Sequence, residues 1–299
     1  MLEEFKNAFS KPNNGHTQLI IINVVIFLVL VILKVFSDWF GFQEFFLSIH
    51  KNFTIPDNFF EFIKRPWTII TYFFTHDLNQ ILHILFNMLT LYWFGKLFVE
   101  YLGSDKLIAL YVLGGITGAL IYLAIYNLIP NPPSFIEKSS GGWMVGASGA
   151  IFAVMVGAAT LLPDYTFLLL LIGPVRIKYI AGFFILLSFM GTTGSNAGGN
   201  LAHLGGALMG FVYIKQLQAG VNWGGWITVV LDWFKNLFKP QSKVKVTYRK
   251  TESKAKSKAT GTSKASQDEI DAILDKISDR GYESLSKDEK EKLFNASKK

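Results

Sequence analysis

The chain has 299 residues, of which 51% are hydrophobic and only 17% charged, whereas about 25% of residues are charged in an average soluble domain. This composition excludes an ordinary soluble globular protein and predicts several membrane spans. The absence of cysteine also excludes disulfides, thiolate nucleophiles and thiolate metal sites.

The formal net charge of +7 belongs entirely to the C-terminal part of the chain. Residues 1–234 contain 12 Lys+Arg and 12 Asp+Glu, whereas residues 235–299 contain 17 and 10, a difference of +7. Basic segments are typical of the cytoplasmic side of a membrane. We therefore expect this tail to lie at the cytoplasmic membrane surface, with no nucleic-acid partner.

Six apolar runs predict membrane-spanning helices. They cover residues 17–36, 78–99, 106–127, 148–162, 177–190 and 200–216. The first run lacks a signal-peptide cleavage site, so we expect it to be retained as a helix. Six spans leave both termini on one side, which the basic tail identifies as cytoplasmic. The sequence thus predicts an all-α, polytopic membrane protein with a six-span domain over residues 17–217.

The segments around the spans carry their own predictions. Residues 1–16 form a short cytoplasmic N-terminal segment. Residues 37–77 combine bulky aromatic residues with scattered charges, which suits an element lying in the membrane interface. The apolar run from Tyr165 to Pro174 is too short to span, so it is also expected at the interface. Residues 191–199 are rich in glycine and are expected to form a flexible loop.

The region after the last span divides into three predicted parts. Residues 218–239 are predicted to form an interfacial amphipathic segment. Residues 240–266 are predicted to form a basic linker of Lys, Ser and Thr without core residues. Residues 267–299 predict a small module of two short helices. The stretch from Ser286 to Glu289 matches a capping box, and Gly281 is suited to end the first helix.

The fourth span begins with a serine among small residues, in "GWMVGASGA". From Ser148 to Leu162 there are 15 residues, roughly 22 Å of helix, whereas the hydrocarbon core is about 30 Å thick. If this helix ends at the cytoplasmic face near Pro163, it must begin below the outer surface. Irregular chain at that depth must be buried in protein or line a wet cavity. The sequence therefore predicts an outward-facing cavity with Ser148 at its floor. The alternative is that Ser148 is simply the N-cap of a helix.

The sixth span carries His203 one turn inside its outer end. Small residues recur every four positions on the same span and on the fourth span. They are Ala202, Gly206 and Gly210 on the sixth span, and Gly149, Ala153 and Gly157 on the fourth. Such faces let two helices approach closely, which would bring His203 within hydrogen-bond reach of Ser148. A serine paired with a histidine is a nucleophile with its base; the alternative is a histidine that only makes structural hydrogen bonds.

The second span carries two further polar residues near its outer end, in "HILFN". His83 and Asn87 are four residues apart and therefore lie on one helix face. Both can donate hydrogen bonds to the oxyanion that forms when a serine attacks a carbonyl. The alternative is that they join neighbouring helices by hydrogen bonds.

Taken in order along six predicted spans, "HILFN", "GASG" and "HLGGALMG" resemble the rhomboid intramembrane serine proteases. The resemblance covers roughly residues 62–216 and includes "RPWTIITYFFTH", similar to the membrane-lying first loop of that family. It implies Ser148 as nucleophile and His203 as general base. It also implies that His83, Asn87, Gly146 and the backbone N–H of Ser148 stabilise the oxyanion or substrate.

The resemblance further implies a substrate class and one departure from the family. The expected partners are membrane proteins with a transmembrane segment, acted on within the lipid bilayer, without a metal or other cofactor. The expected location is the cell membrane, specifically a bacterial inner membrane. Phe152 occupies the position where the family often has a tyrosine stacked on the catalytic histidine. We expect a changed active-site hydrogen bond rather than lost activity.

The same residues disfavour three other functions. A non-catalytic rhomboid-like protein that binds client helices usually lacks the serine or the histidine, and both are present here. A transporter is disfavoured because there is no internal repeat and no carboxylate within spans 4–6. A zinc site formed by His76, His83 and His203 would leave Ser148 without a role.

Overall fold

The computed structural model describes residues 8–9, 13–129, 142–170, 172–237 and 267–297. The predicted linker at 240–266 lies outside these residues, as does most of the predicted N-terminal segment. The chain divides into two compact units, residues 1–240 and 241–299, and each is described by itself.

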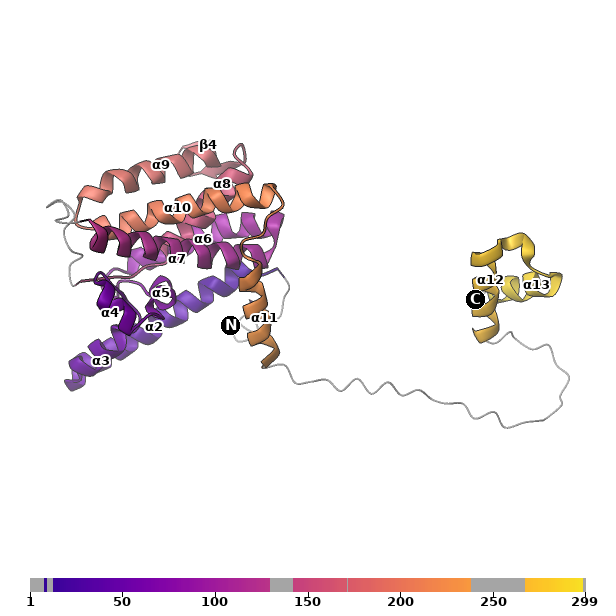
Figure 1. Cartoon of the computed structure of the whole chain (residues 1–299), viewed down its shortest axis with the longest axis horizontal. Coiled ribbons are helices and arrows are strands. Elements are labelled where there is room, and N and C mark those ends of the chain that lie inside the picture. Colours follow the sequence, from indigo (N-terminus) through magenta and orange to yellow (C-terminus); the bar gives the residue numbers. More distant parts are fainter. Residues whose placement is uncertain (1–7, 10–12, 130–141, 171, 238–266, 298–299) are drawn as a thin grey trace. The chain divides into compact units, whose positions relative to one another are not determined.

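Six helices of the first unit coincide with the six predicted spans (Figure 1). They are α2 (Gly15–Phe40), α6 (Ile81–Leu102), α7 (Ser104–Leu128), α8 (Ser148–Leu161), α9 (Ile177–Met190) and α10 (Ala197–Gln218). The largest difference is at the end of α2, which continues to Phe40 instead of Phe36. The helix α6 lies three residues later than predicted at both ends, and α10 begins three residues early at Ala197. The predicted all-α architecture is confirmed.

Three of these helices, α2, α6 and α7, are long and apolar enough to cross a membrane on those grounds alone. The helices α8 and α9 have 14 residues each, about 21 Å against a hydrocarbon core of about 30 Å. In α8, ten of the 14 residues are buried, so this short helix is enclosed by protein. The buried residues lie between Gly149 and Ala159, so protein neighbours enclose this short helix along most of its length.

The helices α8 and α10 approach until their backbones touch. A Cβ atom built on Gly206 would overlap the carbonyl oxygen of Gly149, and one built on Gly210 would overlap that of Ala153. The ideal Cβ position of Gly149 lies 3.2 Å from the carbonyl oxygen of Ala202. The two faces of small residues therefore meet at Gly149 and Ala153, where no larger side chain fits between α8 and α10. The third predicted residue, Gly157, instead faces Leu110 of α7.

The segment between α2 and α6 is a set of short elements. It contains α3 (Gln43–His50), β1 (Ile55–Pro56), α4 (Phe59–Lys64), α5 (Thr68–Thr71) and the 3-10 turn η1 (Tyr72–Phe74). Its strand β1 pairs antiparallel with β2 (Trp143–Met144), which precedes α8. The Tyr72 hydroxyl donates to the carbonyl oxygen of Gly115 at 2.6 Å and so fixes η1 to α7. Exposed aromatic rings at Phe42, Phe45 and Phe60 fit the predicted interfacial position.

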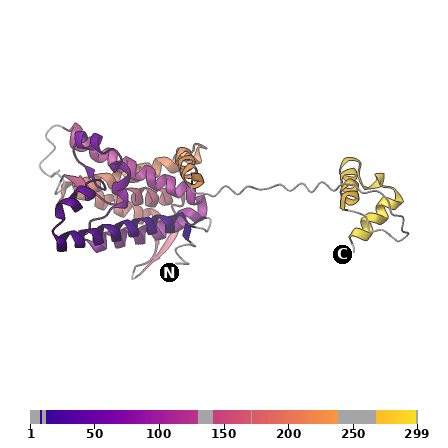
Figure 2. The same cartoon turned by 90° about the horizontal axis from the view of Figure 1, so that it is seen from below.

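The apolar run after α8 forms a hairpin of β3 (Thr166–Leu169) and β4 (Gly173–Arg176). One face of the hairpin packs on α6, where the rings of Phe167 and Phe94 lie 5.2 Å apart. The other face leaves Leu168 exposed, and the hairpin extends outward from the helices (Figure 2). Sequence reasoning gave no secondary structure for this run, and its interfacial location stays a prediction.

The segment from 191 to 199 is more ordered than predicted. It begins with η2 (Gly191–Thr193), and α10 has already started at Ala197. The Asn200 amide donates to the carbonyl oxygens of Gly191 and Asn196, both at 2.9 Å. Part of this segment is therefore helical where a loop was predicted, and one side chain ties the turn to the first residues of α10. The flexibility of the segment stays a prediction.

The predicted helices after α10 are present. The helix α11 (Gly225–Leu237) lies within the segment 218–239, and its position at the interface stays a prediction. In the second unit, α12 (Gln267–Arg280), η3 (Tyr282–Ser284) and α13 (Lys287–Ala296) form the small module. Gly281 ends α12 with a φ of 77°. The capping box is present: the Ser286 hydroxyl accepts from the Glu289 N–H, and the Glu289 carboxylate accepts from the Ser286 N–H.

We expect the substitution Gly206→Ala to destabilise the membrane unit, because the added methyl group would overlap the Gly149 carbonyl. Overpacking of this kind costs about 1–3 kcal/mol. The matched control is Gly182→Ala on α9, where nothing lies within 4 Å of the ideal Cβ position. Thermal unfolding of both variants in one detergent tests this, and equal midpoints for the two would contradict it.

The capping box predicts a pH dependence for the module. The hydrogen bond from the Ser286 N–H, followed by one from Lys276, lowers the pKa of Glu289 from 4.5 to about 2. Because the folded value is the lower one, the stabilisation is fully present above pH 4.5 and is lost as pH falls towards 2. We expect Glu289→Gln to speed hydrogen exchange in residues 282–297 at pH 6, with a smaller difference from the wild type at pH 3. After correction for intrinsic exchange rates, a difference independent of pH would refute this assignment.

Candidate active site

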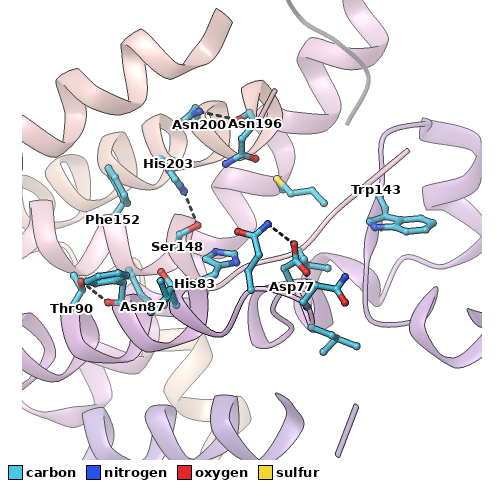
Figure 3. Close-up of a pocket in the computed structure, with 18 of the residues that line it drawn as sticks. Asp77, His83, Asn87, Thr90, Trp143, Ser148, Phe152, Asn196, Asn200 and His203 are labelled. Carbon is cyan, nitrogen blue, oxygen red and sulfur yellow. Dashed lines mark hydrogen bonds between the residues drawn. The ribbon is translucent and has the colours of Figure 1, made fainter. Parts of the chain in front are cut away.

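A cavity of about 1100 Å³ lies among α6, α8, α9 and α10 (Figure 3). It is lined by residues of these helices, of the segments just before α6, α8 and α10, and of α2 and α3. Ser148 and His203 line it together with His83 and Asn87. The polar residues far apart in the sequence therefore share one cavity, as the sequence predicted.

Ser148 is the first residue of α8, and the N-cap position is taken by Ala147, which makes no side-chain cap. The Ser148 hydroxyl instead lies 2.6 Å from Nε2 of His203 on α10 (Figure 3). The alternative that Ser148 merely caps its helix therefore does not hold. The distance follows from the glycine contact between α8 and α10, which sets the two helices at nearly touching separation.

The imidazole of His203 has contacts on three sides. Its Nε2 faces Ser148, and its Nδ1 lies 3.0 Å from the hydroxyl of Ser188 on α9. One ring face stacks on Phe152, with ring centroids 4.4 Å apart and an interplanar angle of 9°. Phe152 follows Ser148 by four residues on α8, so one helix carries both the serine and the ring that supports its partner.

Hydrogen-bond donors without acceptors gather beside Ser148. The side-chain nitrogen of Asn87 is buried and has no hydrogen-bond partner within the described residues. His83 lies one turn before it on α6 and also lines the cavity. Because Ser148 begins α8, its own N–H has no acceptor within the helix. The positive end of the α8 dipole adds to the attraction for a negative charge at this point.

Gly146 contributes open space next to these donors. Its φ of +134° is one that side-chain-bearing residues rarely adopt. A Cβ atom there would lie 3.4 Å from His83 and 3.5 Å from the Ser148 hydroxyl. Its N–H already donates to the carbonyl oxygen of Tyr72 at 3.1 Å. Gly146 thus offers room for a bound group, and not a free donor.

The ring of His76 packs against the ring of His83. The two rings meet edge to face with centroids 5.5 Å apart, and His76 is fully buried. Burial, followed by the charge of His83, lowers the pKa of His76 to about 3, so its ring is neutral at physiological pH. Within the described ranges, no group of three or more potential ligands is placed to hold a metal ion. The alternative zinc site at His76, His83 and His203 therefore gains no support.

Sequence reasoning missed Ser188, which no motif included. The signal was present, because Ser188 is a single hydroxyl within the apolar run "AGFFILLSFM" and intramembrane polar groups are candidates for function. Three further polar residues that line the cavity, Asp77, Gln80 and Asn200, were also missed from the sequence. Gln80 donates to the Asp77 carboxylate at 2.8 Å.

Comparison with known families identifies two regions of the chain. The Rhomboid domain family matches residues 64–218. Residues 262–299, which include the small helical module, match DUF6576, a family of unknown function.

Several curated proteins are similar to this chain. RHOMBOID-like protein 12, mitochondrial, of Arabidopsis thaliana is 33% identical over 206 residues, which cover 66% of this chain and 59% of that protein. Rhomboid protein 1, mitochondrial, of Saccharomyces cerevisiae is 28% identical, covering 54% and 45%. Rhomboid protease GlpG of Salmonella newport is 30% identical over 89 residues, covering 30% and 26%. The chain thus spans less than two thirds of the length of each of these relatives.

The stacked ring predicts a measurable effect on the serine. Phe152→Leu removes the aromatic face from His203, whereas Phe152→Tyr keeps it. Because aromatic pairs contribute about 0.5–1.5 kcal/mol, we expect the leucine variant to label roughly two- to tenfold more slowly with a fluorophosphonate at Ser148. The tyrosine variant should retain most of the wild-type rate. A leucine variant as fast as the tyrosine variant would show that stacking is irrelevant to reactivity.

Proposed function

Because the chain belongs to the rhomboid family, with the Rhomboid domain matching residues 64–218, we propose that it is an intramembrane serine endopeptidase. Its substrates are membrane proteins, which it cleaves within or near a transmembrane segment. The proposal rests on the 2.6 Å hydrogen bond between the Ser148 hydroxyl and Nε2 of His203 at the cavity. A serine held against a histidine base has the arrangement of an activated nucleophile.

The first chemical step is attack on the substrate. The Ser148 oxygen bonds to the carbon of the scissile carbonyl while Nε2 of His203 takes the hydroxyl proton. The carbonyl oxygen becomes an oxyanion and needs donors that are already in place. Asn87, with its unpaired side-chain nitrogen, is the strongest candidate donor, and the Ser148 N–H and His83 complete the proposed set.

The second step releases the amine product. The protonated His203 gives its proton to the leaving nitrogen as the C–N bond breaks, which leaves an acyl group on Ser148. Water then attacks this ester with His203 again acting as base. Three polar residues that line the cavity, Asp77, Gln80 and Asn200, support the entry of this water.

The shape of the site supports an extended substrate. A helical peptide hides its carbonyl groups in backbone hydrogen bonds, so the segment must unwind before a carbonyl reaches Ser148. Gly146 leaves space between His83 and Ser148 where the oxyanion can sit. The resemblance to the rhomboid proteases further implies that helix-destabilising residues near the cleavage site, and a small residue before it, are favoured.

The protein is a membrane protein, and its topology is part of the proposal. The basic residues 235–299 support a cytoplasmic position for the C-terminus and, with six spans, for both termini. A bacterial inner membrane is proposed from the sequence. The mitochondrial names of two relatives do not add to that assignment.

The activated serine predicts specific covalent labelling. We expect a fluorophosphonate to modify the purified protein at Ser148, identified by peptide mapping, because attack by the serine needs only its base and the donor groups. Labelling should vanish in Ser148→Ala and fall at least a hundredfold in His203→Ala. Thr160→Val, which removes a hydroxyl from α8 away from the cavity, should label at the wild-type rate.

A folded wild type that does not label, beside a serine hydrolase that does, would contradict the dyad. Attention would then turn to a rhomboid-like protein that binds client helices without cutting them. Circular dichroism and thermal unfolding of each variant separate loss of labelling from loss of fold.

A further inference from the structure

Most of α9 faces away from the rest of the protein. Its buried residues are Ile177, Ala181 and Ser188, which lie on one face of the helix. Ser188 is the polar residue among the three, and only 4% of it is exposed. A buried hydroxyl needs a hydrogen-bond partner. The partner of the Ser188 hydroxyl is Nδ1 of His203, at 3.0 Å.

His203 therefore lies between two serines on two different helices. The Ser148 hydroxyl is at its Nε2, and the Ser188 hydroxyl is at its Nδ1. A neutral imidazole has one N–H and one lone pair, so the two contacts are linked. If Nε2 is to accept the Ser148 proton, the ring hydrogen must be on Nδ1, where the Ser188 oxygen is its acceptor.

We propose that Ser188 is a positioning residue for the reaction. It acts on His203 as the third member of a hydrogen-bonded Ser148–His203–Ser188 triad. This inference rests on the proposed protease function. Ser188 favours the tautomer with Nδ1 protonated and holds the ring at the angle at which Nε2 meets Ser148. It occupies the place that a carboxylate has in serine hydrolases with a triad.

The hydrogen bond to Ser188 has its largest effect in the transition state. When His203 has taken the proton from Ser148, both ring nitrogens carry a hydrogen and both must donate. The Ser188 oxygen accepts from Nδ1, so the positively charged ring has a partner on each side. The hydrogen bond from Nδ1 is present in the neutral ring and strengthens when the ring becomes charged. Ser188 therefore stabilises the transition state more than the ground state, which lowers the barrier and raises kcat.

The same face of α9 supports the ring in a second way. Phe184, one turn before Ser188, meets the edge of Phe152 with ring centroids 6.5 Å apart at 82°. Phe152 in turn stacks on His203. Ser188 thus fixes the ring through a hydrogen bond, and Phe184 supports the residue on which the ring stacks. Both contacts come from a helix with little other buried surface, so the position of α9 and the geometry of the base are coupled.

The expected change in kcat depends on the hydrogen bond that the Ser188 hydroxyl makes to His203. A neutral hydroxyl contributes about one ordinary hydrogen bond, and not the field of a buried carboxylate. We therefore expect kcat to fall about tenfold when the hydroxyl is lost, with KM nearly unchanged.

The decisive comparison is between Ser188→Thr and Ser188→Val. These two side chains have almost the same shape, and only threonine keeps the hydroxyl, so any effect of added bulk cancels. The control for loss of a helix hydroxyl elsewhere is Thr160→Val on α8. The full-length protein is reconstituted in vesicles, and kcat and KM are measured with a fluorogenic transmembrane peptide. In parallel, ring ¹⁵N-labelled histidine reports the protonation of Nδ1 of His203 by NMR.

The expected result is near-normal turnover in the threonine variant and about tenfold lower kcat in the valine variant. The ¹⁵N signal of Nδ1 should show a protonated nitrogen in the wild type, with a lower protonated fraction in the valine variant. Equal kcat for the two variants, or an unprotonated Nδ1 in the wild type, overturns the proposal. If the wild type itself neither labels nor cleaves, the protease function fails, and the NMR comparison still decides whether Ser188 sets the tautomer of His203.

Discussion

The backbone contact between α8 and α10 is the constraint on which the rest of the site depends. Because Gly206 and Gly210 have no side chains, α10 can contact the carbonyl groups of Gly149 and Ala153 on α8. Within a bilayer, close packing and hydrogen bonds must hold helices together because lipid is as apolar as their side chains. The 2.6 Å separation of Ser148 and His203 is a direct result of this contact.

A second consequence of close packing is that α8 can be short. Its start lies inside protein, so Ser148 and its free N–H face a cavity instead of the membrane surface. The segment before α6 also supports this arrangement. The carbonyl of Tyr72 holds the N–H of Gly146, and β1 pairs with β2 just before α8. Elements far apart in the sequence therefore fix the irregular chain that leads into the nucleophile.

The sequence was sufficient for those features that depend on composition and period. Six apolar runs located six helices, and the four-residue spacing of small residues identified which two of them touch. The sequence was insufficient where a contact from another part of the chain, outside α8 and α10, determines the geometry of the site. Ser188 belongs to an apolar helix with no small-residue face, so nothing in its own neighbourhood shows that it reaches His203. The N–H of Gly146 is occupied by a residue more than seventy positions earlier, a pairing that no local pattern reveals. The hairpin at Phe167 gives no strand signal in the sequence because its first strand runs into a stretch of leucines without alternating polar residues.

The glycine contact also bears on how this protein would respond to random mutation. In a deep mutational scan, the helix faces at Gly206 and Gly210 should be as intolerant as the two residues proposed to do the chemistry. The reason would differ, because replacements at the glycines would lower the amount of folded protein, whereas replacements at Ser148 would leave abundance intact. A map of abundance set beside a map of activity would therefore separate the residues that build the site from those that use it.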